Sequence, residues 1–176
     1  ELEQQKVADL NGDGRDDALL LMRKSGSAGT PPRILAVVLR QKHGYALAEM
    51  NSRIIPHSDD TSYEDPMADG ELTAQPGYFS LKLTIMSGAG SYQMETLHYR
   101  FHYQNGCFRL IGYDRMQTNR ATLDTNDLII DFLAGEAIQR TGNAQSDAEE
   151  KKRDTLKTNP RLCFRDLDDA IVFHPQ

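Results

Sequence analysis

The amino-acid sequence predicts a mainly β protein, built as an antiparallel β-sandwich or a strongly curved sheet with little helix. Three observations support this fold class. Apolar and polar residues alternate with a period of two in several segments, an Asn-Gly dipeptide separates two such segments, and many segments end at turn-forming residues. Residues 1–145 carry these patterns and are expected to form one β-rich domain.

The best-defined element is a hairpin over residues 94–113. Asn105 and Gly106 lie at its centre, and this dipeptide suits a two-residue type I′ turn because both positions need a positive φ. The turn predicts three opposed pairs, which are Tyr103 with Phe108, Phe101 with Leu110, and Tyr99 with Gly112. One side of the hairpin is then almost wholly aromatic and aliphatic, and we expect it to lie on a core.

Further strands are expected at residues 18–23, 34–40, 45–51, 78–86, 128–132 and 137–141. Two short connections that contain glycine, residues 42–44 and 133–136, predict two more hairpins. Seven or eight strands in about 140 residues is the spacing of a sandwich or a strongly curved sheet.

The last part of the chain is more polar. Residues 146–160 are expected to form a polar helical connector, because Ser146 and Glu149 have the spacing of a capping box. Glu149 and Arg153 would add a favourable i,i+4 pair on such a helix. Residues 161–176 are expected to return to the domain as a docking strand or tail.

Composition and charge exclude several classes of protein. With 39% hydrophobic and 26% charged residues, the chain is neither disordered nor fibrous. Its formal net charge of -6 and the lack of a basic cluster argue against a nucleic-acid partner. No apolar run approaches the roughly 20 residues that a membrane-spanning helix needs.

The sharpest motif is an acidic loop near the start of the chain, where residues 9–17 read DLNGDGRDD. Calcium takes six to eight hard oxygen ligands, and a tightly coiled loop can supply them from alternate positions. The predicted ligands are the side chains of Asp9, Asn11, Asp13 and Asp17 and the backbone carbonyl of Arg15. The competing interpretation is a turn rich in Asp, Asn and Gly that binds no metal.

The loop departs from an EF-hand, because Leu20 stands where a bidentate glutamate belongs and strand-like residues follow. It instead resembles the calcium loop of integrin-type FG-GAP and VCBS repeats, a resemblance that covers residues 7–21. The resemblance implies a structural rather than a catalytic ion. Because the motif occurs once, a propeller of repeated blades is excluded.

A looser resemblance covers more of the chain. The order of DLNGDGRDDALLL, a Gly-rich loop, LHYRFHYQNGCFRLIGYDR and DFLAGEA is similar to uncharacterised bacterial secreted proteins and lipoproteins. This resemblance implies export to the periplasm or the medium and, for a lipoprotein, a lipid anchor upstream of Glu1. It implies no particular reaction.

The chain contains two cysteines, Cys107 and Cys163, which lack the spacing of a zinc or thiol redox motif. They either form a disulfide or are small buried hydrophobic residues. The disulfide is favoured, because a calcium-type loop suits the calcium-rich and oxidising conditions outside the cytosol.

Residues 57–71 are rich in carboxylates and form a candidate recognition loop. Acidic groups aimed at a basic partner would speed association, and aromatic and methionine side chains would supply contact area. The candidate partner-binding residues are Asp59, Asp60, Tyr63, Glu64, Asp65 and Met67. The competing interpretation is a solvated loop.

The sequence favours a non-enzymatic extracytoplasmic protein that binds another protein, such as an inhibitor or immunity protein against a secreted toxin. It contains no GxSxG, HExxH or phosphate-binding loop motif. One alternative is an envelope hydrolase with dispersed carboxylates and with His98 or His102 as acid or base. The other is a ligand-binding or structural lipoprotein domain.

Overall fold

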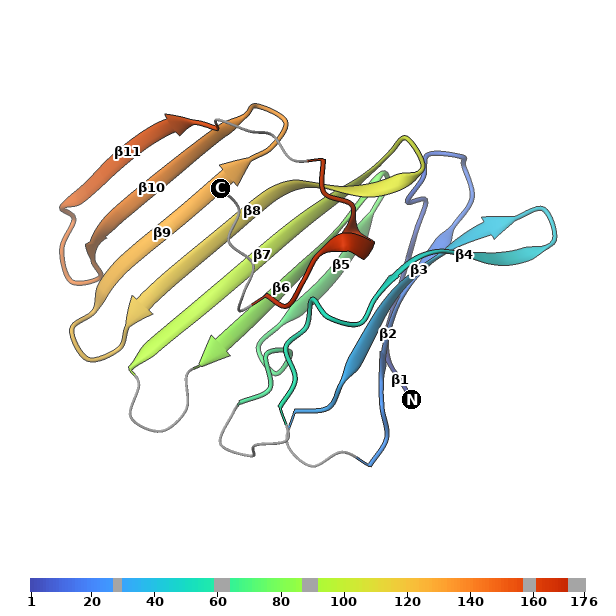
Figure 1. Ribbon diagram of the computed structural model, residues 1–176, viewed down its shortest axis with the longest axis horizontal. Helices are drawn as coiled ribbons and strands as arrows, with labels where there is room; N and C mark the ends of the chain where they lie inside the picture. The colour runs from blue at the N-terminus through green and yellow to red at the C-terminus, as the bar shows by residue number, and fades with distance from the viewer. Residues whose placement is uncertain (27–29, 59–63, 87–91, 157–160, 171–176) are drawn as a thin grey trace.

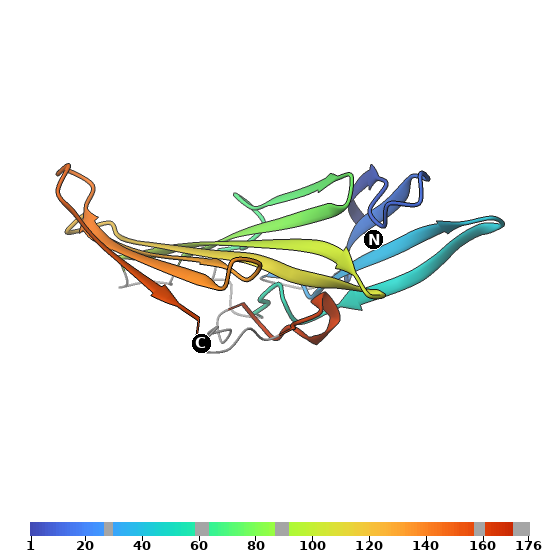
Figure 2. The same ribbon diagram turned by 90° about the horizontal axis from the view of Figure 1, so that it is seen from above.

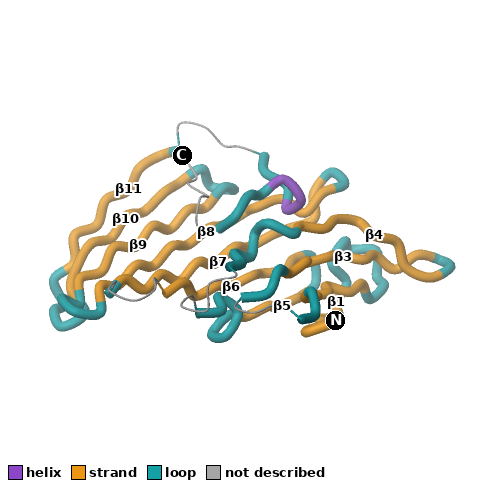
Figure 3. The backbone as a smooth tube through the Cα atoms, turned by 60° about the horizontal axis from the view of Figure 1, so that its bottom comes forward, coloured by secondary structure: helices purple, strands orange, loops and turns teal. Residues whose placement is uncertain are grey.

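The structure is a computed structural model that describes residues 1–26, 30–58, 64–86, 92–156 and 161–170. These residues form two antiparallel β-sheets and one short 3-10 helix (Figures 1 and 3). The mainly β class predicted from the sequence is confirmed. The described residues form no helix with the length and hydrophobicity that crossing a membrane would need.

The smaller sheet, which we call the small sheet, is a meander of four strands in sequence order. The strands are β1 (Leu2–Ala8), β2 (Asp17–Arg23), β3 (Arg33–Gln41) and β4 (Gly44–Asn51). The predicted strands at residues 18–23, 34–40 and 45–51 are therefore confirmed. Strand β1 was not predicted from the sequence.

The larger sheet is a second meander, again with each strand beside its neighbours in sequence. Its strands are β5 (Glu71–Gln75), β6 (Tyr78–Met86), β7 (Gln93–Gln104), β8 (Cys107–Asn119), β9 (Asp124–Asp131), β10 (Glu136–Asn143) and β11 (Glu149–Thr155). Strands β9 to β11 extend away from the small sheet (Figures 1 and 2).

One hydrophobic core joins the two sheets. Strands β2 and β3 contribute Leu19, Leu21, Leu35 and Val37, and strands β6, β7 and β8 contribute an aromatic set, which is Phe79, Tyr99, Phe101, Phe108 and Tyr113. The aromatic rings contact one another, with Phe79 and Phe101 stacked at 4.7 Å between centroids. Because the alternating apolar residues of β6 all point into this core, its other face carries Ser80, Lys82 and Thr84.

The predicted Asn-Gly hairpin is the centre of the large sheet. Asn105 and Gly106 both have positive φ values, and Tyr103 pairs with Phe108 as expected. The predicted pairing of Tyr99 with Gly112 is wrong, because a β-bulge lies between Arg100 and Phe101 and shifts the register by one residue. Tyr99 therefore pairs with Tyr113, which keeps both rings in the core.

The predicted polar helical connector over residues 146–160 is also wrong for its described part, residues 146–156. Residues 149–155 form β11, which pairs along its whole length with β10, from Gly142 opposite Glu149 to Glu136 opposite Thr155. A helix here would have had no apolar face to bury, whereas a strand satisfies its backbone groups on the sheet edge. The strand is entirely exposed, and its charged residues discourage further edge pairing.

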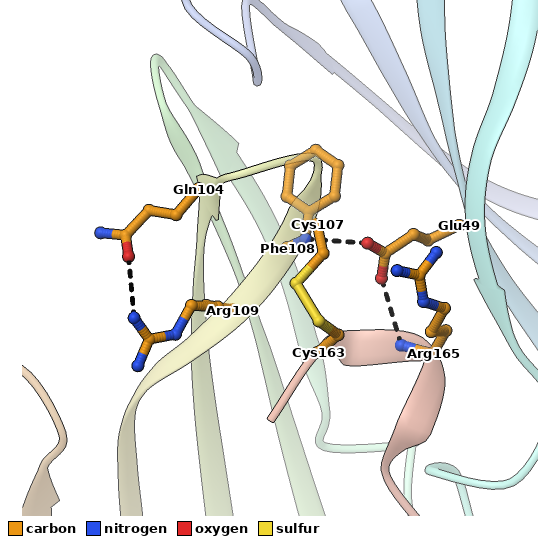
Figure 4. Close-up of a disulfide and its surroundings, with 7 residues drawn as sticks. All are labelled: Glu49, Gln104, Cys107, Phe108, Arg109, Cys163 and Arg165. Atoms are coloured by element: carbon orange, nitrogen blue, oxygen red, sulfur yellow. Dashed lines mark hydrogen bonds between the residues drawn. A yellow bond between two sulfur atoms is a disulfide. The ribbon is translucent and has the colours of Figure 1, made fainter. Parts of the chain in front are cut away.

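The C-terminal segment docks onto the core. Helix η1 (Phe164–Asp166) places Phe164 against Phe79 and Phe101, at 5.4 and 5.3 Å between ring centroids. Asn51 donates from its side-chain amide to the carbonyl oxygens of Phe164 and Leu167, at 2.7 and 2.9 Å. A disulfide joins Cys163 to Cys107 on β8 (Figure 4). Residues 171–176 lie outside the described residues.

Glu49 holds the small sheet, β8 and the C-terminal segment together (Figure 4). Its two carboxylate oxygens accept from the amide of Phe108 at 2.9 Å and from the amide of Arg165 at 3.2 Å. Burial raises the pKa of Glu49, and the two amide hydrogen bonds partly oppose that rise. A single buried side chain thus positions two segments that are far apart in the sequence.

Candidate functional site

The predicted calcium loop is the turn between β1 and β2. The carboxylate of Asp9 accepts hydrogen bonds from the backbone amides of Gly12, Asp13 and Gly14, at 2.8 to 3.1 Å. The side-chain oxygen of Asn11 accepts from the amide of Asp13 at 3.0 Å. Gly12 and Gly14 have φ near +80°, the left-handed conformation that glycine adopts without strain.

Two of the predicted ligands already form hydrogen bonds or an ion pair within the protein. Asp13 forms an ion pair with Arg15 at 2.7 Å, and the hydrogen bond from Arg15 holds the pKa of Asp13 below its ordinary value. Asp17 is fully buried, and its carboxylate accepts from the amides of Leu10 and Arg40 at 2.9 and 2.8 Å. Asp17 therefore joins the root of the loop to strand β3.

The oxygen-rich composition of the loop suits calcium, but its carboxylates bind the loop's own amides and Arg15. Within the described ranges, no three His, Cys, Asp or Glu side chains are arranged to hold a metal ion. Each carboxylate oxygen can accept twice, so Asp9 and Asp13 retain capacity for a cation if Arg15 moves aside. Calcium binding stays a prediction.

The predicted recognition loop is described in part. Asp59, Asp60 and Tyr63 lie outside the described residues. Glu64 is exposed, whereas Asp65 forms an ion pair with Arg33 at 2.7 Å and Met67 is buried in the hydrophobic core. Asp65 and Met67 thus stabilise the fold in this structure, and the recognition role of the loop stays a prediction.

The two histidines considered as acid or base lie on β7, on the face turned away from the core. His98 lies 3.6 Å from Asp114, and Arg100 pairs with the same carboxylate at 2.6 Å. Burial would raise the pKa of Asp114, but hydrogen bonds from His98 and Arg100 hold it below its ordinary value. The group is a cross-strand charge cluster between β7 and β8.

A small cavity lies beside the bridge between Thr30 and Ser58. Its volume is 220 Å³, below the roughly 300 to 1,000 Å³ typical of small-molecule sites. The residues that line it are Thr30, Pro56, His57, Ser58, Glu64, Pro66 and Ile85. The cavity contains neither His98 nor His102, so it does not assemble the predicted acid or base with the carboxylates.

The most distinctive surface is the face of the small sheet that points away from the core, which we call the outer face. The strand register places its residues in rows across the sheet. These residues are Leu2, Gln5, Val7, Ala18, Leu20, Met22, Ile34, Ala36, Val38, Arg40, Tyr45, Leu47 and Met50. Six of the ten exposed large hydrophobic residues in the described part of the chain lie here.

The outer face is unusually apolar for an uncovered surface. Val7, Leu47 and Met50 are each more than half exposed. If each of the six large residues exposes roughly 100 Å² of side chain, together they expose on the order of 600 Å². This area is at the upper end of the range for the largest apolar patch on a soluble monomer. Strands β1 to β4 are described in full, and their outward-facing residues include no carboxylate.

The sequence of β2 and β3 carried a signal for this surface. Residues 18–22 read ALLLM and residues 34–39 read ILAVVL, which are continuous apolar runs rather than alternating ones. Such runs are typical of strands that are covered on both faces. In this structure only one face of these strands packs into the hydrophobic core.

The turn between β3 and β4 projects beyond one end of the small sheet, along the direction of its strands (Figure 2). Residues 40–47, which we call the finger, are all exposed, and Figure 2 shows the hairpin reaching beyond the rest of the molecule. Arg40 lies over the ring of Tyr45, at 4.8 Å from its guanidinium carbon to the ring centroid. The finger extends the outer face outward and gives it a cationic end.

Comparison with known proteins found no family model, no curated protein and no solved structure that matches this chain.

Proposed function

We propose that this chain is a non-enzymatic, extracytoplasmic protein-binding module and that it binds its partner through the outer face of the small sheet. The observation that carries this proposal is the uncovered apolar face, whose strands have the sequence of strands covered on both sides. On the opposite face of the same sheet, the apolar side chains of β2 and β3 are buried in the core shared with the large sheet.

The shape of the surface favours a protein over a small molecule. Small ligands bind in concave pockets, whereas the outer face is an open sheet surface with a projecting hairpin. Its apolar area, on the order of 600 Å², approaches the roughly 800 Å² that each partner contributes to a stable interface. The aromatic Tyr45 and the cation Arg40 belong to the residue types that most often dominate binding energy.

An inhibitor or immunity protein that blocks a secreted toxin is the form of this function that we propose. A rigid domain with a projecting hairpin suits insertion into the cleft of an enzyme, because little order is lost on binding. The disulfide supports an extracytoplasmic location, since such bonds persist in oxidising compartments.

The test is affinity capture from the envelope of the producing cells, with wild type and a face variant run side by side. Leu47→Ser with Met50→Ser removes apolar side chains from the outer face and leaves the core unchanged. Leu133→Ser is the matched control, because Leu133 is 62% exposed in the turn between β9 and β10. Any captured protein is then purified and its affinity measured by calorimetry.

We expect a near-stoichiometric partner that wild type and Leu133→Ser retain and that the face variant binds at least about tenfold more weakly. If the partner is an enzyme, an equimolar amount of the wild-type chain is expected to inhibit it. A partner that binds the face variant as tightly as wild type would contradict the proposed surface.

We also propose that the β1–β2 loop binds calcium as a structural ion, held by Asp9, Asn11 and Asp13 with the carbonyl of Arg15. Calcium would neutralise the carboxylates and lock the turn at the root of the small sheet. At calcium concentrations about tenfold above the dissociation constant, binding would stabilise the fold by about 1.4 kcal/mol.

Asp13→Ala is expected to lower the melting temperature in calcium and to abolish the difference between calcium and chelator. Asp147→Ala is the control, because Asp147 is an exposed carboxylate in the turn between β10 and β11. Thermal melts of the three proteins in calcium and in chelator provide the measurement. A wild-type melting temperature that is the same in both solutions would remove the calcium proposal.

A further inference from the structure

The finger shares Arg40, Tyr45 and Leu47 with the outer face, and its charge is opposite in sign to that of the whole chain. It reads RQKHGYAL and contains two cations, one histidine and no carboxylate, in a chain whose net charge is -6. Among the described residues, neither Arg40 nor Lys42 forms an ion pair. Positive charge is thus gathered at the end of an apolar surface, without an ion-pair partner in the part of the chain that the structure describes.

The finger is also firmly held at its root. The buried carboxylate of Asp17 accepts from the amide of Arg40 at 2.8 Å, and Leu39 next to it lies in the hydrophobic core. The hairpin bonds continue to the end of the finger, where Gln41 pairs with Gly44. A hairpin fixed in this way loses little conformational entropy when it inserts into a partner.

We infer that the finger and the outer face bind a protein whose complementary site is apolar and bordered by carboxylates, with Arg40 and Lys42 reaching those carboxylates. This inference rests on the proposed function and specifies the chemistry of the partner. Opposite charge at the rim of an interface accelerates association and fixes orientation, while the apolar centre supplies affinity.

Charge also decides between this partner and a second copy of the chain. A copy packed face to face would present the same outer face, which has no carboxylate for Arg40 or Lys42. Two like-charged fingers and two apolar faces would then meet without charge pairing, which disfavours a symmetric dimer. An acidic site on a different protein satisfies both the apolar and the cationic parts of the surface.

The test uses the whole chain as bait for a display library of random peptides, so it does not depend on first finding the natural partner. Three variants are compared with wild type. Arg40→Glu with Lys42→Glu reverses the finger charge, Lys151→Glu with Lys152→Glu makes the same change of net charge on β11, and Leu47→Ser with Met50→Ser removes apolar contacts. Affinities of enriched peptides are measured at low and high salt.

We expect enriched peptides that combine aromatic or aliphatic residues with Asp and Glu. Reversal of the finger charge is expected to weaken their binding by about tenfold and to remove most of its salt dependence, while the β11 control binds as wild type does. Loss of Leu47 and Met50 is expected to weaken the same peptides.

Five results would overturn the inference. Peptides indifferent to the finger charge but weakened by loss of Leu47 and Met50 would reject the acidic partner and leave the proposed function standing. Peptides whose affinity is changed neither by reversal of the finger charge nor by loss of Leu47 and Met50 would reject both the acidic partner and the proposed binding surface. Absence of enrichment would reject the acidic site, and so would finger-dependent binding to phosphatidylglycerol vesicles or finger-dependent self-association in sedimentation, which would assign the surface to lipid or to a second copy.

Discussion

Removal of the disulfide, by replacing Cys107 and Cys163 with alanine together, is expected to lower the free energy of unfolding by about 4 kcal/mol. The bond closes a loop with a sequence separation of 56, and in the chain-entropy model a cross-link of that span strongly restricts the unfolded chain. The measurement is urea unfolding of the variant and of wild type, followed by both fluorescence and circular dichroism.

The structure adds a local reason for a large effect. Cys163 directly precedes Phe164, whose fully buried ring contacts Phe79 and Phe101 in the aromatic core. The same segment is held by backbone pairing of Arg109 with Cys163 and by a hydrogen bond from the amide of Leu110 to the carbonyl of Leu162 at 2.9 Å. Without the disulfide, these contacts alone must retain the C-terminal segment.

Wild type treated with a reductant is the natural control, because it keeps both cysteine side chains. We expect it to unfold at nearly the same urea concentration as the alanine variant. A loss below about 1 kcal/mol in both proteins would show that Phe164 and the Asn51 hydrogen bonds hold the segment without the covalent link.

The hairpin over residues 94–113 shows what local chemistry can predict. The Asn-Gly turn, two of the three predicted opposed pairs and the core face follow from residues that are close in sequence, and the structure confirms them. The bulge after Arg100 was not foreseeable from that pattern. It depends on a register set by neighbouring strands rather than by the turn.

Strand β11 shows where local signals mislead. A capping-box spacing and an i,i+4 pair favoured a helix, but the free edge of β10 provides backbone hydrogen bonds that outweigh weak helix signals worth a few tenths of a kcal/mol each. The choice between helix and strand depends here on a tertiary contact with β10, which the local sequence of residues 149–155 does not reveal. Strand β1 was not predicted for the same reason, because its polar sequence has no clear strand pattern and it forms a strand by pairing with β2.

The candidate site was predictable only in part. The acidic loop of residues 9–17 could be found by its spacing, whereas the role of Asp17 in holding Arg40 requires a contact across 23 residues. The apolar runs in β2 and β3 were visible as candidate strands. Only the topology shows that one of their faces is left uncovered, because a sequence does not tell how many layers a fold contains.

Arg33→Met is expected to lower the free energy of unfolding by about 3 kcal/mol near neutral pH. The guanidinium of Arg33 is almost completely buried and makes short ion pairs with Glu3 at 2.6 Å and Asp65 at 2.7 Å. It thereby joins β1, β3 and the segment before β5. Methionine fills a similar volume but leaves Asp65 without its ion-pair partner and Glu3 with only the longer contact to Arg23. Removal of one member of a buried ion pair costs more stability than replacement of the whole pair.

Arg23→Met is the matched control, because Arg23 pairs with Arg33 across β2 and β3 and also reaches Glu3, at 3.7 Å. Its side chain is 42% exposed, so its ion pairs are screened by water and salt. We expect a loss below about 1 kcal/mol for this control. Equal losses for the two variants would contradict a special role for the buried guanidinium.

The pH dependence of the stability difference between Arg33→Met and wild type provides a second check, because the direction of its change can be predicted. Burial alone would raise the pKa of Asp65, but the hydrogen bonds and charge of Arg33 hold it below its ordinary value. A carboxyl group whose pKa is lower in the folded chain contributes stability above its ordinary pKa and loses it as the pH falls through the folded pKa. The deficit of the variant relative to wild type is therefore expected to be full at about pH 7 and to shrink below about pH 4. A deficit that stays constant across this range would mean that lost packing, rather than the ion pair, accounts for the effect.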